Sequence, residues 1–173
     1  MKRYDVINQL IKEREYTSYL EIGVSTGKNF NRIKCENKIG VEPTSDGIDS
    51  DKFFEQNQDK FDIIFIDGLH TAEQVEKDII NSWNALNPKG IIILHDVNPR
   101  TKESQLVPKV SSPWKGDVWR AFYGFMKSYP KVKAYYTDQD SGLGFIEKSR
   151  HKVSEGFIES EMTYEEFDKV RYS

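Results

Sequence analysis

The sequence of 173 residues predicts an α/β fold, in which helices cover both faces of a doubly wound, mostly parallel sheet. The first observation is the apolar run from Ile63 to Ile66, which suits a strand that is buried on both faces of a sheet. A second run of the same kind extends from Ile91 to Leu94. The third observation is that such runs alternate with helical patterns, because a helix is the usual crossover between two parallel strands.

The first part of the chain contains three clear strand patterns. Apolar residues recur at helical spacing over residues 5–15, and the short strand that follows, from Ser18 to Gly23, ends in glycine. Pro43 closes the next strand, because proline cannot continue a ladder. The expected elements are a helix at 5–15, a strand at 18–23, a short helix at 28–34, a strand at 38–42, a minimal strand near Ile48, a helical stretch around 52–54 and a strand that ends at Ile66.

The second part of the chain ends in a predicted hairpin. Thr71 and Gln74 form a capping-box pattern, which predicts the start of a helix, and residues 87–90 end that helix. Residues 97–116 show no periodicity, and a loop of that length in a compact domain is usually functional or disordered. The remaining expected elements are a strand at 91–94, a helix that begins near Val118, paired strands at 132–137 and 143–147, and a short helix at 163–170. Residues 1–148 are therefore expected to form one domain, and residues 149–173 a polar tail.

Composition narrows the class of protein. The formal net charge is −3 without a basic block, so there is no electrostatic case for binding nucleic acid or an anionic membrane. The single cysteine, Cys35, cannot form an internal disulfide, which fits a reducing compartment. The sequence shows neither the apolar core of a signal peptide nor a run long enough to span a membrane. We expect a cytoplasmic protein.

A glycine-bearing turn follows the first expected strand. Gly23 and Gly27 would let a ligand approach the backbone closely, but Ser25 stands where a dinucleotide-binding turn has its middle glycine. The turn therefore favours a ligand without a pyrophosphate. Glu42 ends the second strand and can accept hydrogen bonds from both hydroxyls of a ribose. Alone, the turn could be structural and Glu42 a solvated strand end, but together they favour a nucleoside site.

Four polar side chains follow the two buried strands. Asp67 and His70 come after the first strand, and His95 and Asp96 come after the second. In open α/β sheets, ligands bind beyond the carboxyl ends of the strands, so these side chains are expected to converge at a site. Any one of them has a simpler explanation, such as Asp67 capping the next helix. The four together favour a reaction centre.

These segments together resemble a class I S-adenosylmethionine-dependent methyltransferase, with a Rossmann-like fold. They are most similar to the compact bacterial methyltransferase domain family 24, which is often associated with O-methylation of glycans and secondary metabolites. The resemblance extends from about Tyr4 to Val170 and includes residues 114–119 and 163–167. One departure is Ile22, which stands where many family members have the first glycine of the turn.

The resemblance implies roles for individual residues. The residues implied in binding S-adenosylmethionine are Glu21, Gly23, Ser25 and Gly27 for its methionine part, Glu42 for its ribose, and Asp67. In related O-methyltransferases, carboxylates at the positions of Asp67, His95 and Asp96 bind a divalent cation that acidifies the substrate hydroxyl. Here one position is histidine, which suits a transition metal better than magnesium. The alternative mechanism is free of metal, with His70 or His95 as general base.

The expected reaction is methyl transfer from S-adenosylmethionine to a hydroxyl of a small molecule or sugar, with residues 97–116 as a substrate lid. Trp114 and Trp119 flank that lid and fit either stacking on a sugar ring or a place in the core. One alternative is an NAD-dependent oxidoreductase on the same fold, which Ser25 disfavours. Another is a non-catalytic binding module of a polysaccharide gene cluster, which His95 keeps open. Assembly as a homodimer is also left open.

Overall fold

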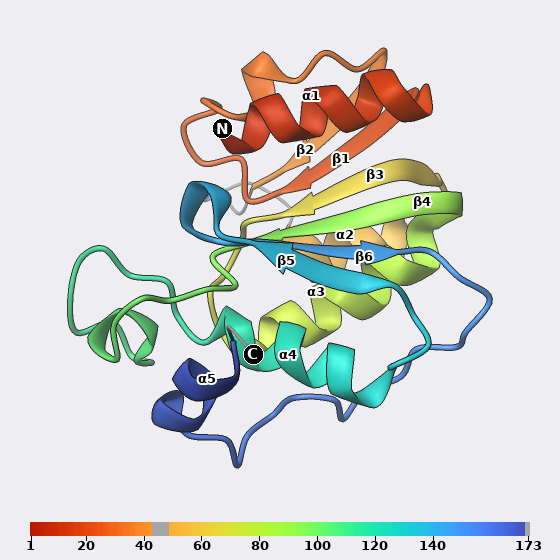
Figure 1. The fold of residues 1–173 in the computed structure, drawn as a ribbon. Helices are drawn as coiled ribbons and strands as arrows, with labels where there is room; N and C mark the ends of the chain where they lie inside the picture. Colours follow the sequence, from red (N-terminus) through yellow and green to blue (C-terminus); the bar gives the residue numbers. More distant parts are fainter. Residues whose placement is uncertain (43–48, 172–173) are drawn as a thin grey trace.

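The structure is a computed structural model that describes residues 1–42 and 49–171 of the chain. These residues form a six-stranded sheet with helices on both faces (Figure 1). The order of strands is β2 (Asn37–Val41), β1 (Ser18–Ile22), β3 (Phe61–Ile66), β4 (Leu86–His95), β6 (Leu143–Glu147) and β5 (Ala134–Thr137). The first four are parallel, and β6 runs antiparallel between β4 and β5. The predicted sheet with a terminal antiparallel hairpin is confirmed.

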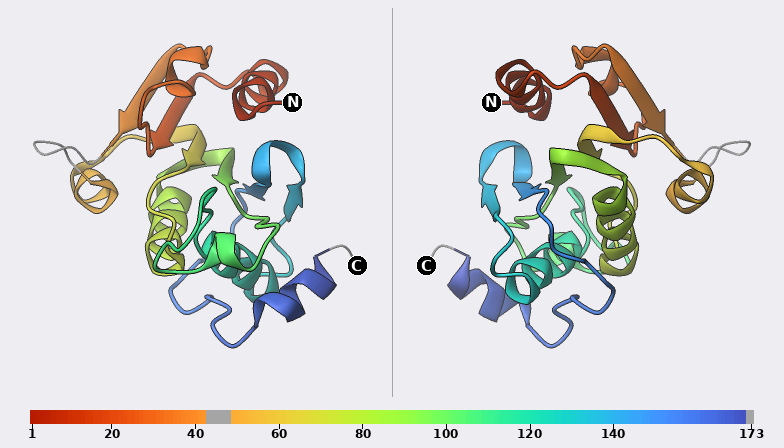
Figure 2. Two further views of the ribbon diagram at one scale, coloured as in Figure 1. Left: turned by 90° about the vertical axis from the view of Figure 1, so that its left-hand side faces the viewer. Right: turned by 90° about the vertical axis from the view of Figure 1, so that its right-hand side faces the viewer.

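The sheet separates the hydrophobic core into two layers. Helices cover both sides of the sheet (Figure 2). On one face lies α1 (Arg3–Arg14), and on the other lie α3 (Ala72–Ala85) and α4 (Val118–Ser128), with α2 (Ser50–Gln56) beside α3. Successive residues of β3 alternate between the two cores, because Ile64 packs on the α3 side and Ile63 and Phe65 pack on the α1 side. Burial on both faces explains why that strand is apolar at consecutive positions.

Two predicted elements that follow the glycine-bearing turn are not seen as predicted. The short helix predicted at 28–34 forms only as a three-residue 3-10 helix at Phe30–Arg32. The ammonium of Lys38 binds the carbonyl oxygens of Phe30 and Ile33 at 2.9 and 3.1 Å, and the Phe30 oxygen also accepts from the Ile33 N–H at 3.2 Å, which closes the 3-10 turn. The minimal strand predicted near Ile48 lies outside the described residues.

The start of α3 also corrects the sequence reasoning. Thr71 is the N-cap residue, but within the described ranges its side chain makes no capping hydrogen bond, and Gln74 donates to Ser50 and Asp51 instead. The predicted capping box is therefore wrong. Asp117, which precedes α4, accepts the hydrogen bond from the Ala72 backbone N–H at 2.7 Å. A side chain distant in the sequence thus caps this helix.

Residues 97–116 form the predicted irregular loop, with a single 3-10 turn at Glu103–Gln105 (η2). The chain ends in α5 (Tyr164–Val170), where Phe167 stacks on Trp119 of α4 with ring centroids 4.3 Å apart. Trp119 is fully buried, so it belongs to the core. None of the described helices is both long and apolar enough to span a membrane.

Candidate active site

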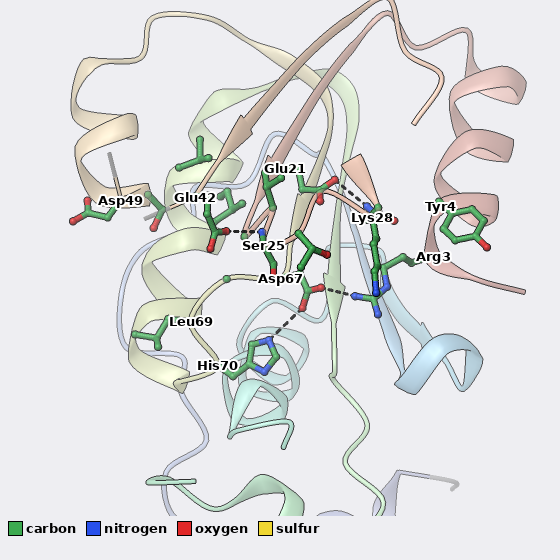
Figure 3. Close-up of a pocket in the computed structure, with 18 of the residues that line it drawn as sticks. Arg3, Tyr4, Glu21, Ser25, Lys28, Glu42, Asp49, Asp67, Leu69 and His70 are labelled. Atoms are coloured by element: carbon green, nitrogen blue, oxygen red, sulfur yellow. Dashed lines mark hydrogen bonds and ion pairs between the residues drawn. The ribbon is translucent and has the colours of Figure 1, made fainter. Parts of the chain in front are cut away.

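A cavity of about 960 Å³ lies at the carboxyl ends of β1, β2 and β3 (Figure 3). The start of α1 contributes Lys2 and Arg3 to its wall, α2 contributes Ser50, and α3 contributes Gln74. A volume of this size is at the upper end of the range for small-molecule sites. The cavity is where the sequence predicts a ligand, because the parallel strands all end there.

The glycine-bearing turn is held tightly against the end of β3. Gly23 has a φ of +88°, and a Cβ at this position would lie 2.1 Å from the carbonyl oxygen of Asp67, so only glycine fits. The backbone N–H of Ser25 donates to Glu42 Oε2 at 2.8 Å. Glu42 therefore braces the turn, and its carboxylate still lines the cavity, where a ribose hydroxyl would meet it.

Glu21 supplies a buried carboxylate at the floor of this turn. Its Oε2 accepts hydrogen bonds from the Tyr19 hydroxyl and from Asn29 Nδ2, the second at 2.9 Å. Burial raises the pKa of Glu21, and these two hydrogen bonds partly oppose that rise. Asn29 Oδ1 is buried without a hydrogen-bond partner among the described residues. Glu21 and Asn29 both line the cavity, so an ammonium group could donate to the two acceptors. Sequence reasoning did not single out Asn29.

The four predicted reaction-centre residues come together at the ends of β3 and β4. Asp67 Oδ1 lies 3.2 Å from His70 Nε2 and 3.1 Å from His95 Nδ1. Asp96 Oδ2 lies 3.1 Å from His95 Nδ1 and 3.7 Å from His70 Nδ1. The structure thus places both histidines between the two carboxylates.

Two cations that sequence reasoning did not assign complete this cluster. Arg3, in the first turn of α1, binds Asp67 through Nη1 and Asp140 through its backbone N–H and Nε, the latter two at 2.9 and 2.8 Å. Lys115, from the long loop, donates to Asp96 Oδ1 at 2.5 Å. Neither cation is near a strand end in the sequence.

The charges around Asp67 and His95 set their protonation. Burial alone would raise the pKa of Asp67, but hydrogen bonds from His70 and His95 and the charges of His95 and Arg3 hold it well below its usual range. Burial alone would lower the pKa of His95, but hydrogen bonds to Asp67 and Asp96, with their negative charges, raise it to about 9. His95 also donates through Nε2 to the Asp140 carbonyl oxygen at 2.7 Å. It is therefore a protonated donor at neutral pH, which argues against its predicted alternative role as general base.

His70 differs from His95 because one of its ring nitrogens is vacant. Nε2 donates to ionised Asp67, whereas Nδ1 is buried and has no hydrogen-bond partner within the described part of the chain. Trp114 stacks on the ring at a centroid distance of 5.6 Å, and the Asp117 N–H donates to the His70 carbonyl oxygen. A Cβ on Gly116 would lie 1.8 Å from that oxygen. The end of the long loop therefore closes over His70.

The predicted metal ligands Asp67, His95 and Asp96 each offer one ligand atom, and these atoms lie within 4.8 Å of one another. The same carboxylate oxygens bind Arg3, Lys115 and the two histidines. The metal ion itself stays a prediction, and the occupied oxygens argue against it.

Residues 31–97 match the model of a family described as a methyltransferase domain. The chain also resembles the O-methyltransferase from Bacillus cereus in complex with S-adenosylhomocysteine, at 15% identity and a TM-score of 0.61, over 84% of this chain and 80% of that one. Two further similar structures are a methyltransferase from Podospora anserina with bound S-adenosylhomocysteine and the O-methyltransferase of tomaymycin synthesis from Streptomyces achromogenes with S-adenosylmethionine. The first has 14% identity and a TM-score of 0.64, over 85% of this chain and 78% of that one. The second has 12% identity and a TM-score of 0.62, over 85% and 79%. No curated protein matched the sequence.

Proposed function

We propose that this chain, whose residues 31–97 match a methyltransferase-domain model, transfers a methyl group from S-adenosylmethionine to a hydroxyl oxygen of a small-molecule or sugar acceptor. The observation that carries the proposal is the meeting of two half-sites in one cavity. A nucleoside-type half, formed by the glycine-bearing turn and Glu42, adjoins a proton-accepting half, formed by Asp67 and His70.

The residues of the first half fit the cofactor. Glu21 and Asn29 Oδ1 would accept from the ammonium of its methionine part, and Glu42 would accept from its ribose. The backbone from Gly23 to Ser25 lies between them, where no long side chain obstructs the ligand. Asp67 would lie beside the sulfonium. Bound S-adenosylmethionine supplies a methyl group on a positively charged sulfur, which is already an excellent leaving group.

The residues of the second half handle the proton of the acceptor. His70 Nδ1 takes the hydroxyl proton, because it is a buried ring nitrogen without a hydrogen-bond partner among the described residues. Asp67 holds the opposite nitrogen as a donor, and Asp96 Oδ2, 3.7 Å from Nδ1, favours the imidazolium that forms. Trp114 covers the ring, so the acceptor reaches Nδ1 when the end of the 97–116 loop moves aside.

Calorimetry with S-adenosylhomocysteine tests the cofactor half. We expect a dissociation constant between about 1 µM and 1 mM, and no binding of NAD under the same conditions. Glu42→Ala is expected to weaken binding by about tenfold or more, since a hydrogen bond to a charged group contributes about 1.5–3 kcal/mol. Glu36→Ala, on the exposed surface outside the cavity, is the matched control. Absence of binding at millimolar S-adenosylhomocysteine would refute the proposal.

Turnover separates an enzyme from a binding module. Release of S-adenosylhomocysteine is measured across a panel of hydroxylated sugars and small aromatic alcohols. Cofactor binding without release from any acceptor would favour the non-catalytic alternative. Retention of NAD in place of the methyl donor would favour the oxidoreductase.

A further inference from the structure

Asp67 has no free carboxylate oxygen to offer a metal ion. Its Oδ1 accepts from His70 Nε2 at 3.2 Å and lies 3.1 Å from His95 Nδ1, and its Oδ2 binds Arg3 Nη1. Arg3 is fixed from a second side, because Asp140 accepts from both its backbone N–H and its Nε. The guanidinium is therefore wedged between the end of β3 and the turn of the β5–β6 hairpin.

Asp96 is occupied in the same way. Lys115 Nζ binds its Oδ1 at 2.5 Å, and its Oδ2 lies 3.1 Å from His95 Nδ1. The side chains of Asp96 and Lys115 are only 6% and 13% exposed, so water screens this pair little. The third candidate ligand, His95, directs Nδ1 at both carboxylates and donates Nε2 to a carbonyl oxygen. Each of the three candidate ligands is thus already bonded within the protein.

A divalent cation at this point would meet two positive charges at close range. A guanidinium cannot lose its proton, so Arg3 can leave Asp67 only by moving away, together with its bonds to Asp140. Like charges a few ångströms apart repel strongly where the effective dielectric constant is low. The residues that surround the cluster therefore do not fit a bound divalent metal ion.

We infer that Arg3 and Lys115 are resident cations that take the place of a divalent metal ion in the reaction centre. Resting on the proposed function, they act as positioning residues. Arg3 fixes Asp67, which orients His70, and Lys115 fixes Asp96 beside His70 Nδ1. Methyl transfer then needs no metal cofactor.

Binding of Mn²⁺ alone, measured by calorimetry and by electron paramagnetic resonance, tests this assignment on the full-length chain. Any purification tag belongs at the C-terminus, because Lys2 and Arg3 line the cavity. The wild type is expected to show no Mn²⁺ binding up to millimolar concentration. The double variant Arg3→Gln/Lys115→Met releases two carboxylate oxygens and is expected to gain Mn²⁺ affinity by about tenfold or more.

Matched variants separate charge from cavity shape. Lys28→Met/Arg32→Gln removes two cations that line the same cavity but make no ion pair among the described residues, and it is expected to leave Mn²⁺ binding undetectable. Arg3→Lys keeps the charge at Asp67 and is also expected to exclude the ion. Thermal unfolding and S-adenosylhomocysteine binding show that each variant is folded.

Two results would overturn the inference. One is Mn²⁺ binding by the wild type that Asp67→Asn abolishes. The other is a folded double variant that gains no Mn²⁺ affinity, because Arg3 and Lys115 would then not be what excludes the ion. Failure of the wild type to bind S-adenosylhomocysteine would instead refute the proposed function, while the Mn²⁺ measurements would remain interpretable.

Discussion

His70 is the side chain on which the proposed proton transfer depends. His70→Gln keeps a polar side chain but removes the vacant basic nitrogen, so the methyl-transfer rate is expected to fall by about 10²–10⁴-fold. Asp67→Asn is expected to lower the rate as well, because it removes the anionic partner of His70 Nε2. S-adenosylhomocysteine binding is measured alongside the rate. His151→Gln, in the exposed C-terminal segment, is the control, and a fully active His70→Gln enzyme would eliminate the proposed base.

His95 is predicted to make stability depend on pH. The pKa of His95 is about 9 in the fold against an ordinary 6.5. The contribution of its protonated ring to the free energy of unfolding is therefore fully present below about pH 6.5 and is lost as the pH rises through 9. The shift corresponds to roughly 3 kcal/mol. Denaturant unfolding of the wild type and His95→Gln is compared from about pH 6 to pH 10, where the gap between the two unfolding free energies should narrow by about that amount. A gap that stays constant over this range would contradict the assigned charge.

At the scale of elements, the N-terminus of α3 provides a test of the cap that sequence reasoning missed. Asp117→Ala removes the acceptor of the Ala72 N–H and is expected to lower the free energy of unfolding by about 1 kcal/mol. Thr71→Ala is the control, because the Thr71 hydroxyl makes no capping bond in the described structure. The free energy of unfolding is measured by denaturant titration. Equal losses in the two variants would contradict the assignment of Asp117 as the capping side chain.

The last helix is predicted to hold the loop in place. Phe167 of α5 stacks on Trp119, while Tyr164 and Arg171 bind the carbonyl oxygen of Pro99. Phe167→Ala is expected to loosen α5 and thereby speed amide hydrogen exchange in residues 98–105, because a buried aromatic side chain is lost. Val170→Ala, at a more exposed position of the same helix, should leave that exchange unchanged. Unaltered exchange in Phe167→Ala would mean that the loop keeps its own structure.

The elements that could be predicted from the sequence are those whose pattern is local. The runs in β3 and β4 follow from burial on both faces, and the hairpin follows from two apolar segments separated by a polar turn. The helix predicted at 28–34 is shortened to a 3-10 turn, beside which the Lys38 ammonium binds the carbonyl oxygens of Phe30 and Ile33. The capping box fails because the Gln74 side chain donates to Ser50 and Asp51, while Asp117, distant in the sequence, accepts from the Ala72 N–H. A local pattern contains no information about Asp117, which lies 45 positions from Ala72.

At the scale of the whole molecule, the candidate site also combines residues that a local pattern predicts with residues that only the folded structure brings close. The meeting of Asp67, His70, His95 and Asp96 was predictable because the ends of neighbouring parallel strands meet at one edge of the sheet, and their role as a reaction centre stays a prediction. The match of residues 31–97 to a methyltransferase-domain model agrees with the resemblance seen in the sequence. Arg3 was not predictable, because its contact with the site depends on how α1 lies across the sheet. That placement results from packing over the whole α1 face and leaves no motif in the sequence.

The bond between Arg3 and Asp140 joins residues 137 positions apart, and His95 donates to the carbonyl oxygen of the same Asp140. A ribosome releases the N-terminal part of a chain first, so the glycine-bearing turn, β3 and β4 emerge before the β5–β6 hairpin. Until β5 and β6 have been synthesised and β6 has inserted beside β4, Arg3 and His95 lack their shared partner. The contacts of Arg3 and His95 with Asp140 therefore form only after the chain has been synthesised beyond residue 140.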